Sequence, residues 1–293
     1  MSKTNPDIIS NLHQDAVMFR EAINFTARVS GFSASLIEKD YFCTLLLAYL
    51  QRQCGSELMF KGGTSLSKVF FDFYRLSEDL DFVIPMPIDA KQKERSARAA
   101  ILKKAVSVLP KELAAFYLTE ELKGANSSRQ YLATFGYKSS LNSQSETIKL
   151  EVGLREPLLR APKLERAKTI LQNAANSQSV IDPLEVKCLS IEEAMAEKFR
   201  AALTRREVAI RDFYDVDHAS RNGMKFGDPD FIDMIRKKLA VPGNDPPNLS
   251  QERLAALRSQ LEPRLKPVLR QDDYNAFDLD RAVEIVKTLH GKL

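Results

Sequence analysis

The sequence predicts an α/β (α+β) protein in two parts, with strands and helices over residues 1–185 and mainly helices over residues 186–293. One basis is a short apolar run that ends in Gly62-Gly63 and continues with helical spacing, the pattern of a strand, a tight turn and a helix. Another is a set of three strand-like stretches between residues 115 and 154. A third is the helical spacing of apolar residues after residue 190, interrupted by turn clusters.

The elements before Pro85 follow from periodicity. Apolar residues that recur at three and four positions predict helices over Asp7–Val29 and Ser35–Arg52, and Ser33 or Ser35 would cap the second. The apolar run Leu58–Lys61 predicts a buried strand that enters the double glycine. Further elements are expected as a helix over Thr64–Phe73 and a strand over Leu80–Ile84, which stops at Pro85.

After Pro85 a helix with a basic outer face is expected over Ala90–Leu109, with Pro110 as its end. The three strand-like stretches are Ala115–Leu122, Gln130–Lys138 and Thr147–Leu154.

The helical part is expected to begin with Ile191–Leu203. Ser190 is the predicted N-cap of this helix, and Glu193 occupies the capping-box position. Another helix is predicted over Ile210–Ser220, with more helices from Gly223 on.

Composition excludes several classes of protein. The chain of 293 residues is 44% hydrophobic and 28% charged, an ordinary globular balance. It has no apolar run of the roughly 18 residues that a membrane helix needs. The N-terminus lacks the pattern of a secretory signal. Three cysteines at wide spacing exclude a disulfide framework and a CxxC metal site, and three histidines without an HxxxH pattern argue against a histidine-rich zinc site. We therefore expect a soluble, reduced, cytoplasmic protein without membrane association.

The charge is distributed unevenly although the net charge is only +4. The segment Lys91–Lys111 contains seven basic residues, Arg95 among them, against one acid, whereas Asp72–Asp81 carries four acids against Arg75. An acidic cluster beside a basic segment suits a metal-dependent enzyme that acts on a phosphate polymer, but chance would also produce it. The basic segment is a candidate for contacts with tRNA phosphates, and a solvated helix face is the alternative.

The residues with the clearest chemistry are Gly62-Gly63-Thr64-Ser65 and, fifteen residues later, Asp79-Leu80-Asp81. A double glycine lets the backbone approach a ligand, and amides at a helix start attract anions. On a strand, two aspartates separated by one residue point to the same face. Carboxylates that close together repel unless a divalent cation lies between them. A phosphate site beside a metal-binding pair predicts nucleotidyl transfer.

Other candidate residues lie further along the chain. Glu151 alternates with the apolar residues of its strand, so it could provide a third carboxylate or be an exposed strand residue. Lys198 and Asp212 are candidates from the helical part, although physical reasoning alone favours a solvated lysine and an Arg-Asp pair at a helix start. His218 is expected to be a surface residue, because it does not share a helical face with Asp215 and Asp217.

Five sets of residues, taken in order, resemble the AbiEii/AbiGii family of nucleotidyltransferase-like toxins, which includes abortive-infection AbiE and MenT toxins. The resemblance extends over about residues 35–220. Its segments are Glu38-Lys39-Asp40-Tyr41, Phe60–Leu66, Arg75–Phe82, Lys149–Val152, and Lys198 with Arg211–Asp215. The resemblance implies a polymerase-β-like nucleotidyltransferase lobe with a mixed sheet, a mainly helical C-terminal lobe and an active site between them.

The resemblance also implies roles for residues. Gly63 and Thr64 match a glycine–hydroxyl pair that contacts phosphates, with Gly62 and Ser65 beside them in the nucleotide-binding segment. Ser77, Asp79 and Asp81 match the second motif, in which the aspartates are metal ligands. Lys198 would hold the triphosphate, and Asp212 would orient Lys198 or the acceptor hydroxyl. Glu151 occupies the position of the third carboxylate, which varies in this family.

The activity implied is the transfer of a nucleoside monophosphate from an NTP to RNA, typically to the tRNA 3′ acceptor end, which blocks translation. The metal would be Mg²⁺ or Mn²⁺. A cognate antitoxin would restrain the enzyme in a type IV-like toxin–antitoxin system associated with phage defence. Two alternatives stay open: transfer of a phosphate or nucleotide to Ser or Thr of a protein such as the antitoxin, and a non-catalytic RNA-binding module.

Overall fold

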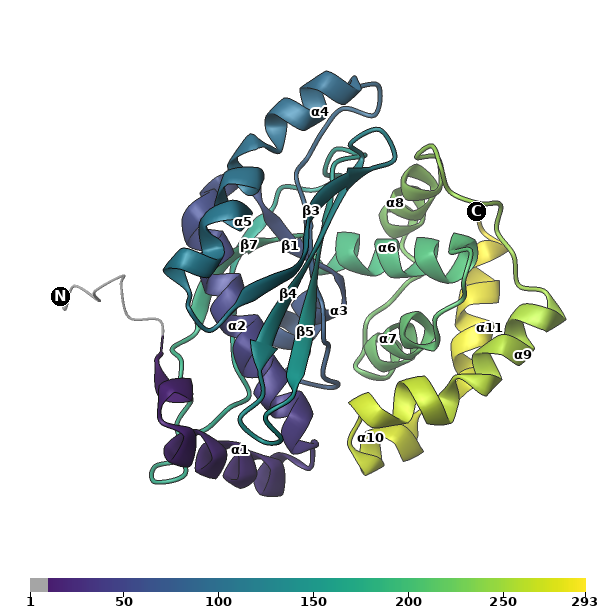
Figure 1. Cartoon of the computed structure of the whole chain (residues 1–293). Helices are drawn as coiled ribbons and strands as arrows, with labels where there is room; N and C mark the ends of the chain where they lie inside the picture. The colour runs from purple at the N-terminus through teal and green to yellow at the C-terminus, as the bar shows by residue number, and fades with distance from the viewer. Residues whose placement is uncertain (1–9) are drawn as a thin grey trace. The chain divides into compact units, whose positions relative to one another are not determined.

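The computed structural model describes residues 10–293 (Figure 1). The chain divides into two compact units. Unit 1 extends to Arg155 and includes Lys163–Cys188, and unit 2 consists of Glu156–Pro162 and Leu189–Leu293. Unit 1 ends at Cys188, whereas the sequence analysis divided the chain at residue 185. The segment Glu156–Pro162 belongs to unit 2 although it lies within the first part of the chain.

Unit 1 contains a mixed sheet of seven strands in the order β3-β4-β5-β2-β1-β7-β6. The pairs β1–β7 and β2–β5 are parallel and the other pairs are antiparallel. This sheet confirms the α/β prediction. The strands are β1 Met59–Lys61, β2 Leu80–Val83, β3 Tyr117–Ala125, β4 Gln130–Lys138, β5 Ser145–Gly153, β6 Lys163–Ala167 and β7 Leu184–Cys188.

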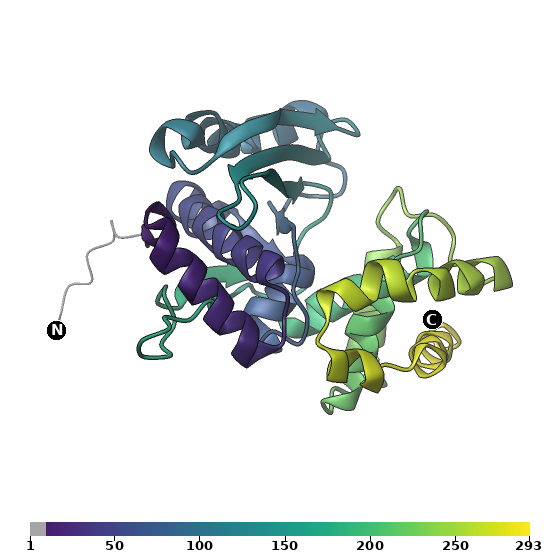
Figure 2. The same cartoon turned by 60° about the horizontal axis from the view of Figure 1, so that its bottom comes forward.

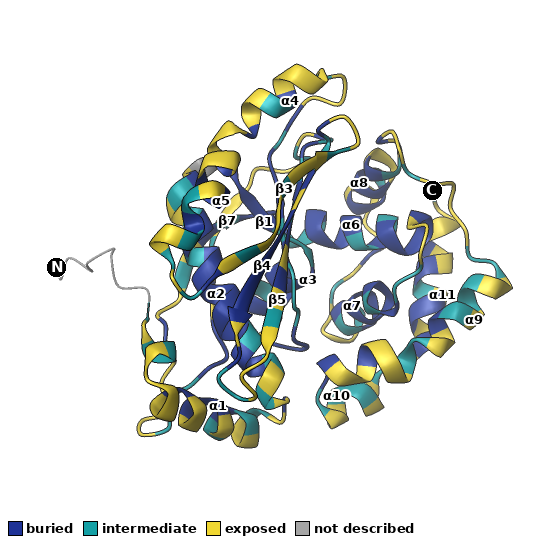
Figure 3. Cartoon of the chain, viewed as in Figure 1, coloured by how far each residue is buried: buried dark blue, intermediate teal, exposed yellow. Residues whose placement is uncertain are grey.

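The helices of unit 1 bury one side of the sheet, and α2 is buried along most of its length (Figure 3). Phe42 of α2 stacks on Tyr137 of β4 with ring centroids 4.0 Å apart. α1 packs beside α2 (Figure 2), and α5 packs on α2, where Tyr49 donates a hydrogen bond to the carbonyl of Ala105. The helices are α1 Ala16–Ser30, α2 Ala34–Cys54, α3 Gly62–Ser65, α4 Gln92–Arg98 and α5 Ala100–Glu112.

Several predicted helix limits in unit 1 are wrong. The first helix starts at Ala16, because the Asp15 carboxylate caps it by accepting from the amides of Val17 and Met18. Residues 7–9 of that prediction lie outside the described residues. Pro110 does not end its helix: α5 continues to Glu112, with Pro110 in the last turn, where the missing N–H removes a single hydrogen bond. The expected helix over 90–109 is also interrupted, at Ala99.

The helix expected over Thr64–Phe73 begins earlier and ends earlier. It starts at Gly62 as α3, continues as a π-helical turn over Leu66–Phe70, and stops before Asp72 and Phe73, whose φ angles are 44° and 58°. These left-handed residues reverse the chain so that it returns to the sheet as β2.

Unit 2 is helical, as predicted. Ser190 caps α6 by accepting a hydrogen bond from the amide of Glu193 at 3.2 Å. Within residues 10–293, no helix is long and apolar enough to cross a membrane. The helices are α6 Ile191–Thr204, α7 Ile210–Arg221, α8 Pro229–Leu239, α9 Gln251–Ser259, α10 Gln271–Ala276 and α11 Leu279–His290.

The capping-box role predicted for Glu193 is wrong. Its carboxylate accepts hydrogen bonds from the amides of Leu159 and Arg160 and pairs with Lys238 of α8 at 2.7 Å. Lys238 is 1% exposed and also contacts Glu156 and Glu197 at 3.2 Å each. Although burial would lower the pKa of Lys238, the three carboxylates raise it well above its usual value. This cluster attaches the segment Glu156–Pro162 to the helices of unit 2.

Candidate active site

The turn after β1 is shaped by contact with Asp81. Lys61 is the register partner of Asp81 across the antiparallel β1–β2 pair, and the next residue, Gly62, has a φ of +76°. A Cβ at Gly62 would lie 2.2 Å from Oδ2 of Asp81. The Asp81 carboxylate therefore occupies the space that any other residue at position 62 would need.

Gly63 is required for a similar reason. A Cβ there would lie 2.1 Å from Nη2 of Arg75, a residue that is 2% exposed. Ser67 Oγ donates to the carbonyl of Arg75 at 2.6 Å, which holds the loop before β2 against the helix. In the structure both glycines leave room for side chains of the protein, Asp81 and Arg75.

The hydroxyls of Thr64 and Ser65 are buried. Thr64 donates its hydroxyl hydrogen bond to the backbone carbonyl of Asp79, which links α3 to the segment carrying the aspartates. Ser65 is 0% exposed, and its Oγ has no hydrogen-bond partner among the described residues. The hydroxyl of Thr64 therefore fixes Asp79, and that of Ser65 lies in the interior.

Three of the predicted carboxylates lie on neighbouring strands. Asp79 directly precedes β2 and Asp81 lies within it, and both are partly exposed while Leu80 and Phe82 between and after them are buried. β2 pairs in parallel with β5, and Asp81 is the register partner of Glu151. Residues paired in register have side chains on the same face of a sheet. The structure therefore brings Asp81 and Glu151 side by side, and Asp79 lies two residues before Asp81 in the chain.

These carboxylates do not form a closed metal site by themselves. Among residues 10–293, no group of three or more His, Cys, Asp or Glu side chains is arranged so that it could hold a metal ion. Mg²⁺ commonly takes only one or two carboxylates and completes its shell with waters and substrate phosphates. The hard oxygen donors of Asp79, Asp81 and Glu151 fit an ion of that kind.

The segment Glu38–Tyr41 of α2 contacts the chain next to Asp79 through an ion pair. Lys39 pairs with Glu78, the neighbour of Asp79, at 3.1 Å. Asp40 is buried and pairs with Lys68 at 2.5 Å, while its other oxygen accepts from the amide of Ile170 at 3.0 Å. Ser77, the remaining predicted residue of unit 1, is partly exposed at the start of the aspartate segment.

In unit 2, Lys198 of α6 lies between two carboxylates of α7. Its Nζ is 2.9 Å from Asp212 and 2.8 Å from Asp215, and its side chain is only 12% exposed. The reading of Lys198 as a solvated lysine is therefore wrong. Asp215 was not among the predicted site residues, and its spacing of three from Asp212 on the helix was the available signal.

Arg205 adds a second cation to this group, 3.2 Å from the other oxygen of Asp212. Burial alone would raise the pKa of Asp212, but Lys198 and Arg205 lower it below its usual value of 3.8. Asp212 is thus a carboxylate near neutral pH, and Lys198 has a fixed orientation.

Within residues 10–293, His218 belongs to no group of side chains that could hold a metal ion. Burial, with the nearby Arg221 guanidinium, lowers the pKa of His218 to about 4, so its ring is neutral at physiological pH. It is half-buried against Tyr214 rather than a plain surface residue. The carboxylate of Asp217 forms ion pairs with Arg281 and Arg221.

Known proteins resemble this chain in sequence and in fold. A family model described as the nucleotidyl transferase AbiEii toxin of a type IV toxin–antitoxin system matches residues 44–284. MenT4, a nucleotidyltransferase toxin from Mycobacterium tuberculosis, has a similar structure, with a TM-score of 0.53 and 17% identity over 91% of this chain and 97% of that chain.

JHP933 from Helicobacter pylori is also similar, with a TM-score of 0.52 and 16% identity over 89% of this chain and 94% of that chain. At these identities the similarity to solved structures shows the fold. Among curated proteins, none matches this chain.

The contact between Gly62 and Asp81 can be tested with Gly62→Ala, with Gly223→Ala as a matched control. Both glycines have left-handed φ angles, but a Cβ at Gly223 would meet nothing within 4 Å. Each substitution should lower the free energy of unfolding by about 1–2 kcal/mol. Only Gly62→Ala should displace the Asp81 carboxylate, with a loss of transferase activity of roughly a hundredfold. Equal activities of the two variants would contradict this account.

The orientation of Lys198 can be tested with Asp215→Asn. Asp217→Asn on the same helix is the control, because both carboxylates are fully buried but only Asp215 contacts Lys198. Both variants should unfold at lower urea concentration. At a temperature where both are folded, Asp215→Asn should lose about tenfold or more in transferase activity, while Asp217→Asn should stay near wild type. A similar loss in both would indicate a general effect of instability.

Proposed function

Since the chain belongs to the AbiEii family of nucleotidyl transferase toxins of type IV toxin–antitoxin systems, we propose that it transfers a nucleoside monophosphate from an NTP to the 3′ acceptor end of tRNA. The observation that carries the proposal is the register of β2 and β5, which puts Asp81 beside Glu151, with Asp79 directly before β2. Carboxylates so arranged are suited to an NTP with a divalent cation. The loss of a usable acceptor end would block translation, and a cognate antitoxin would restrain the enzyme.

In the reaction, the acceptor hydroxyl oxygen forms a bond to the α-phosphorus of the NTP. The bond from that phosphorus to the bridging oxygen breaks, and pyrophosphate leaves with the electron pair while the hydroxyl proton is released to solvent. A bound Mg²⁺ or Mn²⁺ supplies charge neutralisation and lowers the pKa of the acceptor hydroxyl. Asp79 and Asp81 would hold this ion, with Glu151 as the third carboxylate.

The remaining site residues act on the nucleotide in this proposal. Gly62 and Gly63 would present their backbone amides to the phosphates, as the family resemblance implies. Thr64 and Ser65 shape the turn from within, and Ser77 would donate to a phosphate oxygen. Lys198, oriented by Asp212 and Asp215, would offset charge on the leaving pyrophosphate.

Label transfer tests the proposal. The purified protein would be incubated with total tRNA, a divalent cation and each α-labelled NTP in turn. Wild type should label tRNA, and Asp79→Asn should label it at least about a hundredfold more slowly. Asp182→Asn, an exposed aspartate of the same unit, should label tRNA as wild type does.

Other results would favour the alternatives. Label that appears on the antitoxin, from an α- or γ-labelled NTP, would favour transfer to a protein hydroxyl. Binding of tRNA without any transfer, unchanged in Asp79→Asn, would favour a non-catalytic RNA-binding module.

A further inference from the structure

The surface around α4 in unit 1 is cationic. Lys91, Lys93 and Lys104 are exposed, and none of them forms an ion pair with a residue in the range 10–293. The acidic residue of α4, Glu94, is engaged, because its carboxylate accepts from the amide of Lys91 at 2.6 Å. We call the exposed residues Lys91, Lys93, Ala97, Arg98 and Lys104 the α4 surface.

Not every basic residue of the segment belongs to this surface. Arg95 is 3% exposed and donates to the carbonyl of Ile88 at 3.2 Å, so it is a structural residue rather than part of a basic outer face. Lys103 donates to Ser96 and lies 5.2 Å from the ring centroid of Tyr131. Lys91 and Lys93 therefore lie together at the start of α4, whereas Lys104 lies further along the chain in α5 and Lys111 in the last turn of α5.

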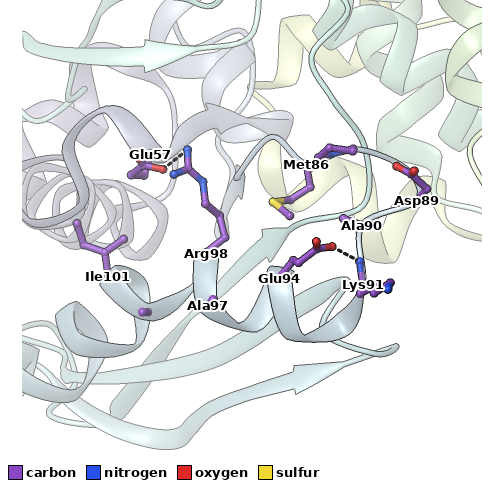
Figure 4. A pocket seen from close by; sticks show the side chains of 11 residues that line it. Glu57, Met86, Asp89, Ala90, Lys91, Glu94, Ala97, Arg98 and Ile101 are labelled. Carbon is purple, nitrogen blue, oxygen red and sulfur yellow. Dashed lines mark hydrogen bonds and ion pairs between the residues drawn. The ribbon is translucent and has the colours of Figure 1, made fainter.

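The α4 surface is also hollowed. A cavity of about 940 Å³ lies between α4 and the segment after β2, with Met86, Pro87 and Ile101 as non-polar walls and Arg98 paired to Glu57 at 2.6 Å (Figure 4). A second cavity of about 690 Å³ adjoins the start of α4. Lys91 and Ala97 line both cavities.

The chain connects this surface directly to the carboxylates. Asp81 lies in β2, and after this strand the chain passes through Met86 to Lys91, ten residues after Asp81. Ten residues span at most about 35 Å. The α4 surface is therefore tied to Asp81 by a chain segment that reaches no further than this.

We propose that the α4 surface binds the sugar–phosphate backbone of the acceptor strand of the RNA. The inference rests on the proposed function and adds the surface of unit 1 that holds the substrate. Lysines without carboxylate partners suit a polyanion, and the larger cavity beside them, with its non-polar walls, can take a ribose or a base. Because the contacts are made to phosphates, they would position the RNA without reading its sequence.

The test measures binding of 5′-labelled total tRNA to the full chain across a salt series. The double variant Lys91→Gln/Lys93→Gln should bind about tenfold more weakly. The negative slope of log K against log salt should become shallower by about 2, one unit for each lost phosphate contact. Lys163→Gln/Arg166→Gln, on exposed positions of the edge strand β6, changes the net charge equally and should bind as wild type does. In label transfer, the α4 double variant should show a raised KM for tRNA with an unchanged kcat.

A second pair of variants tests the same surface without changing any lysine. Ala97→Glu puts a negative charge between the two cavities, and Ala97→Gln adds the same bulk without charge. Weaker tRNA binding by the Glu variant than by the Gln variant is expected.

The outcomes separate the two proposals. If wild type labels tRNA but the α4 variants match their controls in affinity and slope, this inference is wrong and the proposed function stands. If the α4 variants bind tRNA normally but escape neutralisation by the antitoxin, the surface serves a protein partner and the inference is again overturned. If wild type labels no RNA, the proposed function itself fails.

Discussion

The candidate site of unit 1 depends on the missing side chain of Gly62. The turn after β1 brings the backbone so close to β2 that the Asp81 carboxylate occupies the position of a Cβ. The register of β2 with β5 then fixes Glu151 beside Asp81, and the hydroxyl of Thr64 ties α3 to the carbonyl of Asp79. At the next residue, Gly63, the Arg75 guanidinium likewise occupies the position of a Cβ. The positions of the carboxylates thus follow from backbone packing.

Away from the glycine turn, buried ion pairs hold neighbouring segments of the chain in place. Lys68 pairs with Asp40 behind the site, Lys198 lies between Asp212 and Asp215, and Lys238 is surrounded by three glutamates. An ion held in this way stabilises the fold only while every partner is present, because removal of one leaves an uncompensated charge in the interior. Lys198 differs from the other two lysines in being partly accessible, so a fixed cation can still meet a ligand.

The sequence pattern was sufficient for an α/β first part, a helical second part, and most elements with strong periodicity, such as β4 and α6, whereas the mixed sheet was implied by the family resemblance. It failed where a tertiary contact decided the outcome. β6 and β7 are five residues long and were missed, because the charged edge strand β6 lacks an apolar run. Glu193 has the pattern of a capping box, but Lys238 and two amides compete for its carboxylate.

The same limit applies to the site residues. The spacing of Asp79 and Asp81 predicted a common face, and strand alternation suggested Glu151, whereas the pairing of Asp81 with Glu151 needed the sheet register. The family resemblance identified Lys198 and Asp212, but physical reasoning alone took Lys198 for a solvated residue. Its second partner, Asp215, became apparent only from the packing of α7 on α6.

The central claim is that Asp81, in the space left by Gly62, is a ligand for the divalent cation that accompanies the NTP. Electron paramagnetic resonance of Mn²⁺ tests it without any turnover, through titration of the protein in the presence of a non-hydrolysable NTP. The account predicts bound Mn²⁺ in wild type and in Asp182→Asn, an exposed aspartate of the same unit, and a loss of at least about tenfold in Mn²⁺ affinity in Asp81→Asn. Mn²⁺ binding that is equal in wild type and Asp81→Asn would contradict it.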